Sequence, residues 1–361
     1  MQQPDCQKAE MTVDRRAPRL SAGLQDRLDA FVERLTHDEE GRLRHEAERT
    51  ALIDASRSLL DRLASGEPAP QPLPPGEPGS LEPGQILANT YTVLEMVGRG
   101  GVCEVYHVQH RELRSERAIK IVRPEHAVDP LVKDMMADEA RALLNLFHPG
   151  VVRCRDLMRH GDGRPFIVMN FVHGPTLAGC IEEGPFHLDA VLALARRLAA
   201  TLAAIHAAGY VHQDISPDNI ILPHGDPRAA MLVDFGIAID LRSNHAMNRP
   251  VSFAGKLSFA SPEQMTGAPV TEASDLYSLG LVIAAAVGGA RVNMGWDDIS
   301  ARAARTAPPC LPDAPAPLLA VLENLLHPDP RSRLTAASLV QLLAYYQSRR
   351  STDEASRQRR V

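Results

Sequence analysis

Five short motifs in a fixed order constrain this chain more than any other feature of its sequence. They are Gly98-Arg-Gly100, Ala118-Ile-Lys120, Glu139, His212-Gln-Asp214-Ile-Ser-Pro-Asp-Asn219 and Asp234-Phe-Gly236. Glycine lets backbone N–H groups approach an anion closely, and lysine adds a positive charge. Carboxylate and amide oxygens are ligands that suit Mg²⁺. Together the motifs indicate a site that binds a phosphate compound with a metal ion.

In this order and spacing the motifs resemble those of the protein kinase family, in its eukaryotic-like branch of bacterial Hanks-type serine/threonine kinases. The resemblance implies an α+β fold with two lobes, a small β-rich N-lobe and a larger α-helical C-lobe, preceded here by an N-terminal helical segment. It also implies ATP with Mg²⁺ or Mn²⁺ as cofactors, and a protein with a serine or threonine acceptor as substrate.

The resemblance assigns a role to each motif residue. Lys120 would hold the α- and β-phosphates, Glu139 would orient Lys120, and Asp214 would be the catalytic base. Asn219 and Asp234 would bind the metal ion. The nucleotide pocket would be formed by Lys120 together with Val97, Gly98, Gly100, Gly101, Cys103, Val105, Ala118, Met169, Asn170, Val172 and Ile221, with Met169 as gatekeeper and residues 170–172 as hinge.

Two positions in and beside these motifs depart from the family pattern. Cys103 stands where the third glycine of the loop is expected, which predicts a stiffer loop with a thiol near the phosphates. Gln213 replaces the arginine that would bind a phosphate on the activation segment, so switching by that route should be weak or absent. That segment, which would run from Asp234 to Glu263, nevertheless contains the hydroxyl residues Ser243, Ser252 and Ser258.

A further departure looks like an exchange of two side chains. The lysine that the family carries two residues after the base is Ser216 here, and the hydroxyl residue expected after Gly255 is Lys256. In the family these positions lie against each other, so the exchange predicts an ammonium near the γ-phosphate and a hydroxyl that hydrogen-bonds Asp214. Ser216 and Lys256 are therefore candidate catalytic residues. The alternative is that both changes mark a decaying active site.

Three residues resemble structural anchors of the family: Glu263, its expected partner Arg333, and Asp275, which would hold the catalytic loop. Small-molecule kinases such as aminoglycoside phosphotransferases share the H-x-D-x-x-x-x-N loop but lack these anchors. The anchors therefore favour a protein substrate. A pseudokinase that acts as a nucleotide-binding scaffold, and a small-molecule kinase, remain the alternatives.

Composition narrows the class of protein. The 361 residues are 44% hydrophobic and 23% charged, as is usual for a soluble globular protein. The net charge of −6 argues against nucleic acid as a partner. No apolar run reaches the roughly 20 residues of a membrane span, and the polar start lacks a signal-peptide core, so we expect a cytoplasmic signalling enzyme without a membrane partner. The five cysteines contain no C-x-x-C pair and indicate neither zinc nor disulfides.

The sequence pattern divides the chain into four parts. Residues 1–64 carry apolar side chains at helical spacing and are predicted to form helices for regulation, for a homodimer or for docking of a partner. Residues 65–86 are rich in proline and glycine and are predicted to be a linker. Residues 87–348 form the kinase-like domain, with helical patterns at 131–147, 188–209, 274–287, 317–326 and 335–348. Residues 349–361 are predicted to be a polar, Arg-rich tail that frays.

Overall fold

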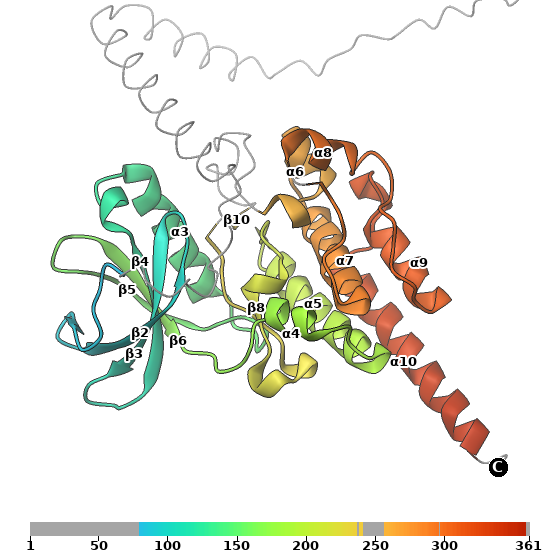
Figure 1. Ribbon diagram of the computed structural model, residues 1–361, viewed down its shortest axis with the longest axis horizontal. Helices are drawn as coiled ribbons and strands as arrows, with labels where there is room; N and C mark the ends of the chain where they lie inside the picture. The colour runs from blue at the N-terminus through green and yellow to red at the C-terminus, as the bar shows by residue number, and fades with distance from the viewer. Residues whose placement is uncertain (1–78, 237, 241–255, 296, 359–361) are drawn as a thin grey trace, which may run out of the picture. The chain divides into compact units, whose positions relative to one another are not determined.

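A computed structural model of the chain describes residues 79–236, 238–240, 256–295 and 297–358 (Figure 1). The predicted N-terminal helical segment and the linker up to residue 78 lie outside the described residues. So does most of the activation segment, residues 241–255, which includes Ser243, Ser252 and Gly255.

The N-lobe is built on one antiparallel sheet of six strands, in the order β1-β2-β3-β4-β6-β5. The strands are β1 (Ile86–Leu87), β2 (Tyr91–Arg99), β3 (Cys103–His110), β4 (Glu116–Val122), β5 (Cys154–Arg159) and β6 (Pro165–Asn170). The β2–β3 hairpin carries the glycine loop, residues 98–103, at its turn. In this way the sheet places the loop beside the strand that bears Lys120.

Because side chains alternate along a strand, the sheet has two apolar faces. One face buries Leu87, Val93, Tyr106, Val108, Ile119, Ile121, Phe166 and Val168. The other face packs against helix α3 (Pro130–Asn145) and the rest of the core, and it includes Ala118, Ile167 and Met169. Asp129 begins α3 by accepting a hydrogen bond from the backbone N–H of Leu131, and Pro130 follows at the first helical position.

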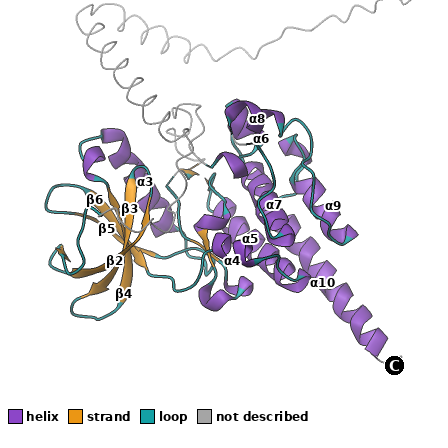
Figure 2. Cartoon of the chain, viewed as in Figure 1, coloured by secondary structure: helices purple, strands orange, loops and turns teal. Residues whose placement is uncertain are grey.

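The C-lobe is mainly helical, as Figure 2 shows. Its helices are α4 (Leu177–Glu183), α5 (Leu188–Ala207), α6 (Pro262–Thr266), α7 (Glu272–Gly288), α8 (Asp298–Ala303), α9 (Ala316–Leu325) and α10 (Ala336–Gln358). Two short antiparallel pairs, β7 (Tyr210–Val211) with β10 (Ile239–Asp240) and β8 (Ile220–Ile221) with β9 (Met231–Leu232), flank the catalytic loop. Short 3₁₀ turns occur at Pro124–His126, Pro217–Asn219, Pro223–Gly225, Pro227–Ala229, Leu257–Phe259 and Pro330–Ser332.

Helix α7 is the centre of this lobe. It is buried from Ser274 to Ala286 and packs against both α5 and α9. A helix that is apolar almost all round fits only in such a position. The predicted two-lobed α+β fold is confirmed. In the part of the chain that the structure describes, no helix is both long and apolar enough to cross a bilayer.

Two segments differ from the predicted pattern. Residues 79–86 belong to the predicted linker, yet Leu81 is buried with only 3% of its surface exposed. Helix α10 continues beyond residue 348, where the polar tail was predicted to begin, as far as Gln358. No proline or glycine interrupts residues 336–358, so nothing in the backbone chemistry ends the helix earlier.

Candidate active site

Three charged side chains from distant parts of the chain meet beside the sheet. Lys120 Nζ lies 2.8 Å from both carboxylate oxygens of Glu139 and 2.8 Å from Asp234 Oδ1. Strand β4 supplies the lysine, α3 supplies the glutamate, and the segment after β9 supplies the aspartate. Lys120 and Glu139 are both buried, so the predicted pair forms inside the molecule.

The cluster holds one ammonium between two carboxylates. Burial disfavours the charge of Lys120, but Asp234 and Glu139 outweigh that cost and raise the pKa of the ammonium. Burial would raise the pKa of Asp234, yet the charge of Lys120 holds it down at about 2. Burial raises the pKa of Glu139. Lys120 and Asp234 are therefore both charged at neutral pH.

Gly236 packs closely against this cluster. Its backbone N–H donates to Asp234 Oδ1 at 2.9 Å. A Cβ atom at this position would lie 3.2 Å from both Asp234 Oδ1 and Lys120 Nζ. A side chain here would therefore require the charged groups to shift by a few tenths of an ångström.

The catalytic loop, residues 212–219, is held in place by one buried carboxylate. Asp275 on α7 accepts hydrogen bonds from the backbone N–H groups of His212 and Gln213, at 2.9 and 2.8 Å, and contacts His206 Nε2 at 2.8 Å. Gln213 has a left-handed backbone, with φ of 66°, and its carbonyl accepts a hydrogen bond from the Gln264 side chain. The predicted anchoring of this loop by Asp275 is confirmed. The anchor also stabilises the unfavourable conformation of Gln213 directly before Asp214.

Asp214 and Asn219 are joined within the loop. Asn219 Nδ2 donates to Asp214 Oδ2 at 2.7 Å and to the Asp214 carbonyl at 3.0 Å. These two bonds use the amide nitrogen, so the amide oxygen of Asn219 remains available as a hard ligand. No group of three or more His, Cys, Asp or Glu side chains in the described ranges could hold a metal ion. Mg²⁺ commonly uses one or two protein ligands with phosphates and water, and the Asn219 and Asp234 oxygens fit that pattern.

The residues predicted to line the nucleotide pocket fall mostly on neighbouring strands. The sheet pairs Gly98 with Val105 and Val105 with Lys120, and it pairs Ala118 with Met169. The remaining members lie as follows: Val97 on β2 with 40% exposure, Gly100, Gly101 and Cys103 in the glycine loop, Asn170 at the end of β6, Val172 just after it, and Ile221 on β8 of the C-lobe, bridged to Thr176.

The predicted anchor between Glu263 and Arg333 is also confirmed. Arg333 Nη1 and Nη2 donate to the two oxygens of Glu263 at 2.7 and 3.0 Å, and Ser274 Oγ donates to Glu263 at 2.6 Å. Burial would raise the pKa of Glu263, but these donors lower it. The pair ties α6 to the turn that precedes α10 and so holds the end of the activation segment.

Comparison with known proteins agrees with this geometry. A family model described as the protein kinase domain matches residues 91–343. The chain belongs to the protein kinase family.

Several curated relatives that resemble this kinase domain come from bacteria. A probable serine/threonine-protein kinase, PkwA of Thermomonospora curvata, is 33% identical over 279 residues, which cover 76% of this chain and 35% of the relative. The serine/threonine-protein kinase PkaA of Streptomyces coelicolor is 32% identical over 273 residues, 70% of this chain and 49% of the relative. PrkC of Bacillus subtilis is 35% identical over 202 residues, 55% of this chain and 30% of the relative. The chain thus spans half or less of the length of these relatives.

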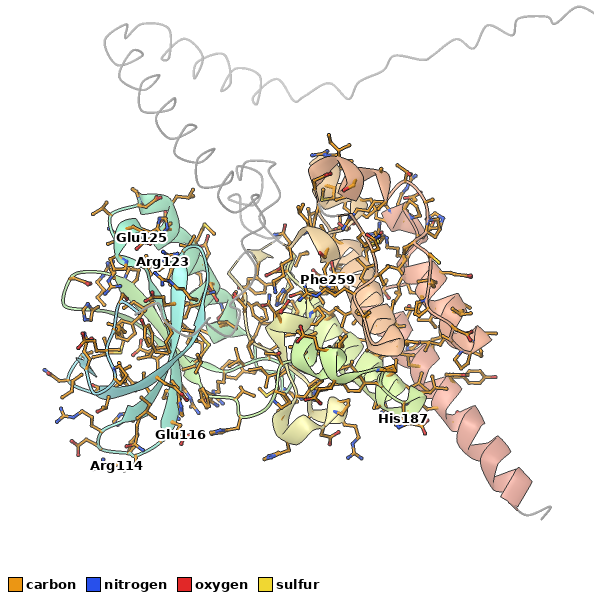
Figure 3. The ribbon with its side chains drawn as sticks, viewed as in Figure 1. Arg114, Glu116, Arg123, Glu125, His187 and Phe259 are labelled. Atoms are coloured by element: carbon orange, nitrogen blue, oxygen red, sulfur yellow. The ribbon has the colours of Figure 1, made fainter. Side chains whose placement is uncertain are left out.

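In this kinase domain, two residues that the motifs did not indicate contact the backbone of the glycine loop. Arg123 Nη1 donates to the carbonyls of Gly100 and Gly101 at 3.2 and 3.1 Å, and His126 Nε2 lies 3.2 Å from the Gly101 carbonyl (Figure 3 labels Arg123). Neither residue stands at a spacing that predicts this contact. Only the turn at Pro124–His126 brings the histidine back to the loop.

The thiol of Cys103 is part of the loop but not a ready nucleophile. Burial raises its pKa to about 12, and the nearby charge of Lys120 only partly opposes this. The thiol is therefore protonated at neutral pH.

The kinase domain brings Ser216 and Lys256 together. Lys256 Nζ donates to Ser216 Oγ at 2.8 Å and to Asp218 Oδ2 at 2.9 Å, and Ser216 is fully buried. The two exchanged positions do lie against each other. The contact of Ser216 Oγ that the structure describes is with Lys256, whereas the Asp214 carboxylate is held by Asn219. Lys256 is thus linked to the catalytic loop through Asp218, a partner that sequence comparison with the family did not suggest.

Proposed function

We propose that this protein is an ATP-dependent serine/threonine protein kinase, which transfers the γ-phosphate of ATP to a hydroxyl of a protein. The observation that carries the proposal is the joined cluster of Lys120, Glu139 and Asp234, with contacts of 2.8 Å. A lysine held in this way presents a fixed positive charge to the phosphates, and fixed charges need no reorganisation during the reaction.

The other residues of the site support complementary roles. Asp214 would accept the proton of the acceptor hydroxyl, since its carboxylate is held in place by Asn219. Asn219 and Asp234 would hold Mg²⁺ or Mn²⁺, which would supply positive charge to the transferring phosphoryl group. Lys256 would add a further positive charge beside the catalytic loop, at the position where it contacts Ser216 and Asp218.

Several features support a protein acceptor and a role in cytoplasmic signalling. The Glu263–Arg333 anchor stabilises the end of an activation segment, and curated relatives are named serine/threonine-protein kinases. The described cysteines Cys103, Cys154, Cys180 and Cys310 are free thiols, as expected in a reducing compartment. The helical spacing of apolar residues in residues 1–64 supports dimerisation or docking of a partner through that segment.

The test is phosphate transfer by the purified chain. The protein is mixed with γ-labelled ATP and Mg²⁺, with and without a generic protein acceptor, and compared with Asp214→Asn. We expect label on serine or threonine of the acceptor for the wild type only, while Asp214→Asn still binds ATP. Binding of ATP without any transfer would identify a nucleotide-binding scaffold, and transfer only to a small molecule would identify a different kinase class.

A further inference from the structure

Residues 79–81, within the predicted linker, are bound to the N-lobe by hydrogen bonds. The backbone N–H and the hydroxyl of Ser80 both donate to Glu104 Oε2, at 3.0 and 2.6 Å. The backbone N–H of Leu81 donates to the hydroxyl of Tyr106 at 3.1 Å, and the Leu81 side chain is buried against the sheet. These residues precede the part of the chain that matches the kinase family, which begins at Tyr91.

The carboxylate that receives Ser80 is buried and charged. Glu104 is only 1% exposed, and it accepts a further hydrogen bond from the Tyr106 hydroxyl at 2.7 Å. Burial would raise the pKa of Glu104, but the donors on Ser80 and Tyr106 and the charge of Arg99 lower it. A buried carboxylate that loses such donors becomes costly, so Glu104 depends on Ser80 for its place in the lobe.

Arg164, which precedes β6, completes the contact. Its Nη1 donates to Ser80 Oγ at 2.9 Å and to the Val122 carbonyl at 3.0 Å, and it is 3% exposed. The Ser80 hydroxyl therefore donates to a buried carboxylate and accepts from a buried guanidinium. We call Ser80, Glu104, Tyr106 and Arg164 the linker anchor.

The linker anchor is directly connected to the glycine loop. Glu104 pairs with Arg99 across the β2–β3 hairpin in the last register position before the turn, and Arg99 Nε lies 3.4 Å from Glu104 Oε1. Cys103 and Val105, on either side of Glu104, point to the opposite face of the strand and pack with the core that borders the nucleotide site. Strand β3 thus presents Glu104 of the linker anchor on one face and presents Cys103 and Val105, beside the nucleotide site, on the other.

We propose that the linker anchor positions the glycine loop for ATP, so that Ser80 acts on nucleotide binding through Glu104 and Arg99. The proposal rests on ATP as the ligand of the proposed function. It extends the machinery for ATP beyond the family-matching region to residues 79–81. Ser80 and Glu104 are positioning residues here, because their side chains contact each other on the face of the sheet opposite Cys103 and Val105.

The experiment measures ATP affinity and loop motion in the full chain. Ser80→Ala removes the hydroxyl shared by Glu104 and Arg164, and Ser80→Thr keeps it. Gly79→Ala adds a Cβ that would overlap the Tyr106 hydroxyl oxygen, and so should displace the same segment. Equilibrium dialysis with Mg²⁺-ATP gives the dissociation constant, and hydrogen exchange follows the Gly100 amide, which donates to the Cys103 carbonyl at 2.8 Å.

We expect Ser80→Ala and Gly79→Ala to weaken ATP binding by about three- to tenfold, the usual consequence of losing one or two hydrogen bonds, and to speed exchange at Gly100. Ser80→Thr should stay within about twofold of the wild type, because its hydroxyl can make the same contacts. Thr90→Ala is the matched control, since its hydroxyl makes only an exposed contact with the Ala88 carbonyl and should leave both readouts unchanged.

A lower melting temperature for Ser80→Ala with unchanged ATP affinity and unchanged exchange at Gly100 would overturn the proposal, because the anchor would then be structural only. Equal effects in Ser80→Ala and Ser80→Thr would overturn it as well. Neither readout requires phosphate transfer. An inactive wild-type chain that shows the expected differences would therefore count against the proposed activity and still support the linker anchor.

Discussion

Two ionic clusters in this kinase domain differ in their charge balance. In the first, the ammonium of Lys120 on β4 lies between the acidic side chains of Glu139 and Asp234, so two acidic groups share one cation. In the C-lobe, the guanidinium of Arg333 faces the single carboxylate of Glu263, and its remaining donors go to backbone carbonyls. The charges of the first cluster are therefore not balanced within the protein, whereas those of the second cluster are.

The difference shows how charge balance distinguishes a cluster that binds a ligand from one that only stabilises the fold. An uncompensated buried charge is costly, so a fold retains one only where a ligand or a metal ion offsets it. A matched pair with every hydrogen bond made can serve as a fixed point of the structure. We therefore expect changes to the first cluster to affect chemistry and changes to the second to affect stability.

The largest expected effect is the loss of activity in Asp234→Asn. The amide keeps the shape of the side chain but removes the negative charge that would hold the metal ion, so transfer should fall by about 10⁴-fold, or about 5 kcal/mol. Labelled-phosphate transfer measures the loss, and circular dichroism checks that the fold is retained. Undiminished transfer would remove Asp234 from the site.

Substitutions in the Glu263–Arg333 pair should lower stability more than activity. Arg333→Met leaves Glu263 buried without its cation and should lower the free energy of unfolding by about 3 to 5 kcal/mol. The double variant with Glu263→Gln should recover part of this loss, because the unpaired charge is then gone. Denaturant titration of the three proteins measures both values. A stable Arg333→Met variant with abolished activity would contradict the contrast between the clusters.

A third ionic contact joins Lys256 to Asp218, and substitution of Lys256 tests whether this contact serves the reaction or only stability. A positive charge near the transferring phosphoryl group typically contributes about 2 to 4 kcal/mol, so Lys256→Met should lower the turnover rate by about a hundredfold. ATP affinity should change much less.

Two further measurements decide how Lys256 acts. Restoring the family arrangement with Ser216→Lys and Lys256→Thr should recover activity that Ser216→Lys alone does not, since two adjacent ammonium groups repel. If Lys256→Met changed only the Michaelis constant for a peptide, and left slow ATP hydrolysis untouched, Lys256 would be a substrate contact instead.

The smallest expected effect is on the acid stability of the cluster of Lys120, Glu139 and Asp234. Lys120 lowers the pKa of Asp234 from its ordinary value near 3.8 to about 2 in the folded state. Its contribution to stability is therefore present above the unfolded pKa and is lost as the pH falls from about 4 towards about 2. Asp234→Asn should unfold with a shallower pH dependence in that range, as followed by circular dichroism. An identical slope in both proteins would mean that Asp234 is not linked to Lys120 in solution.

Much of the site could be predicted because the motifs are local in sequence and their order is specific. The pairing of Lys120 with Glu139 and of Glu263 with Arg333 was expected from resemblance to the family, and both contacts are present. The contacts of Arg123 with the glycine loop could not be predicted in this way. No residue type or spacing marks an arginine that donates to backbone carbonyls across a turn.

The sequence by itself determined the two-lobed fold, since five ordered motifs, alternating strands and amphipathic helices all agree with one architecture. Only the tertiary structure decided that Ser80 and Leu81, within the predicted linker, pack on the N-lobe. It also decided that Lys256 contacts Asp218 as well as Ser216. Composition describes how a segment behaves on average. The burial of Leu81 and the hydrogen bond from Ser80 to Glu104, 24 residues further along the chain, can outweigh that average. These partners become neighbours only when the sheet has formed.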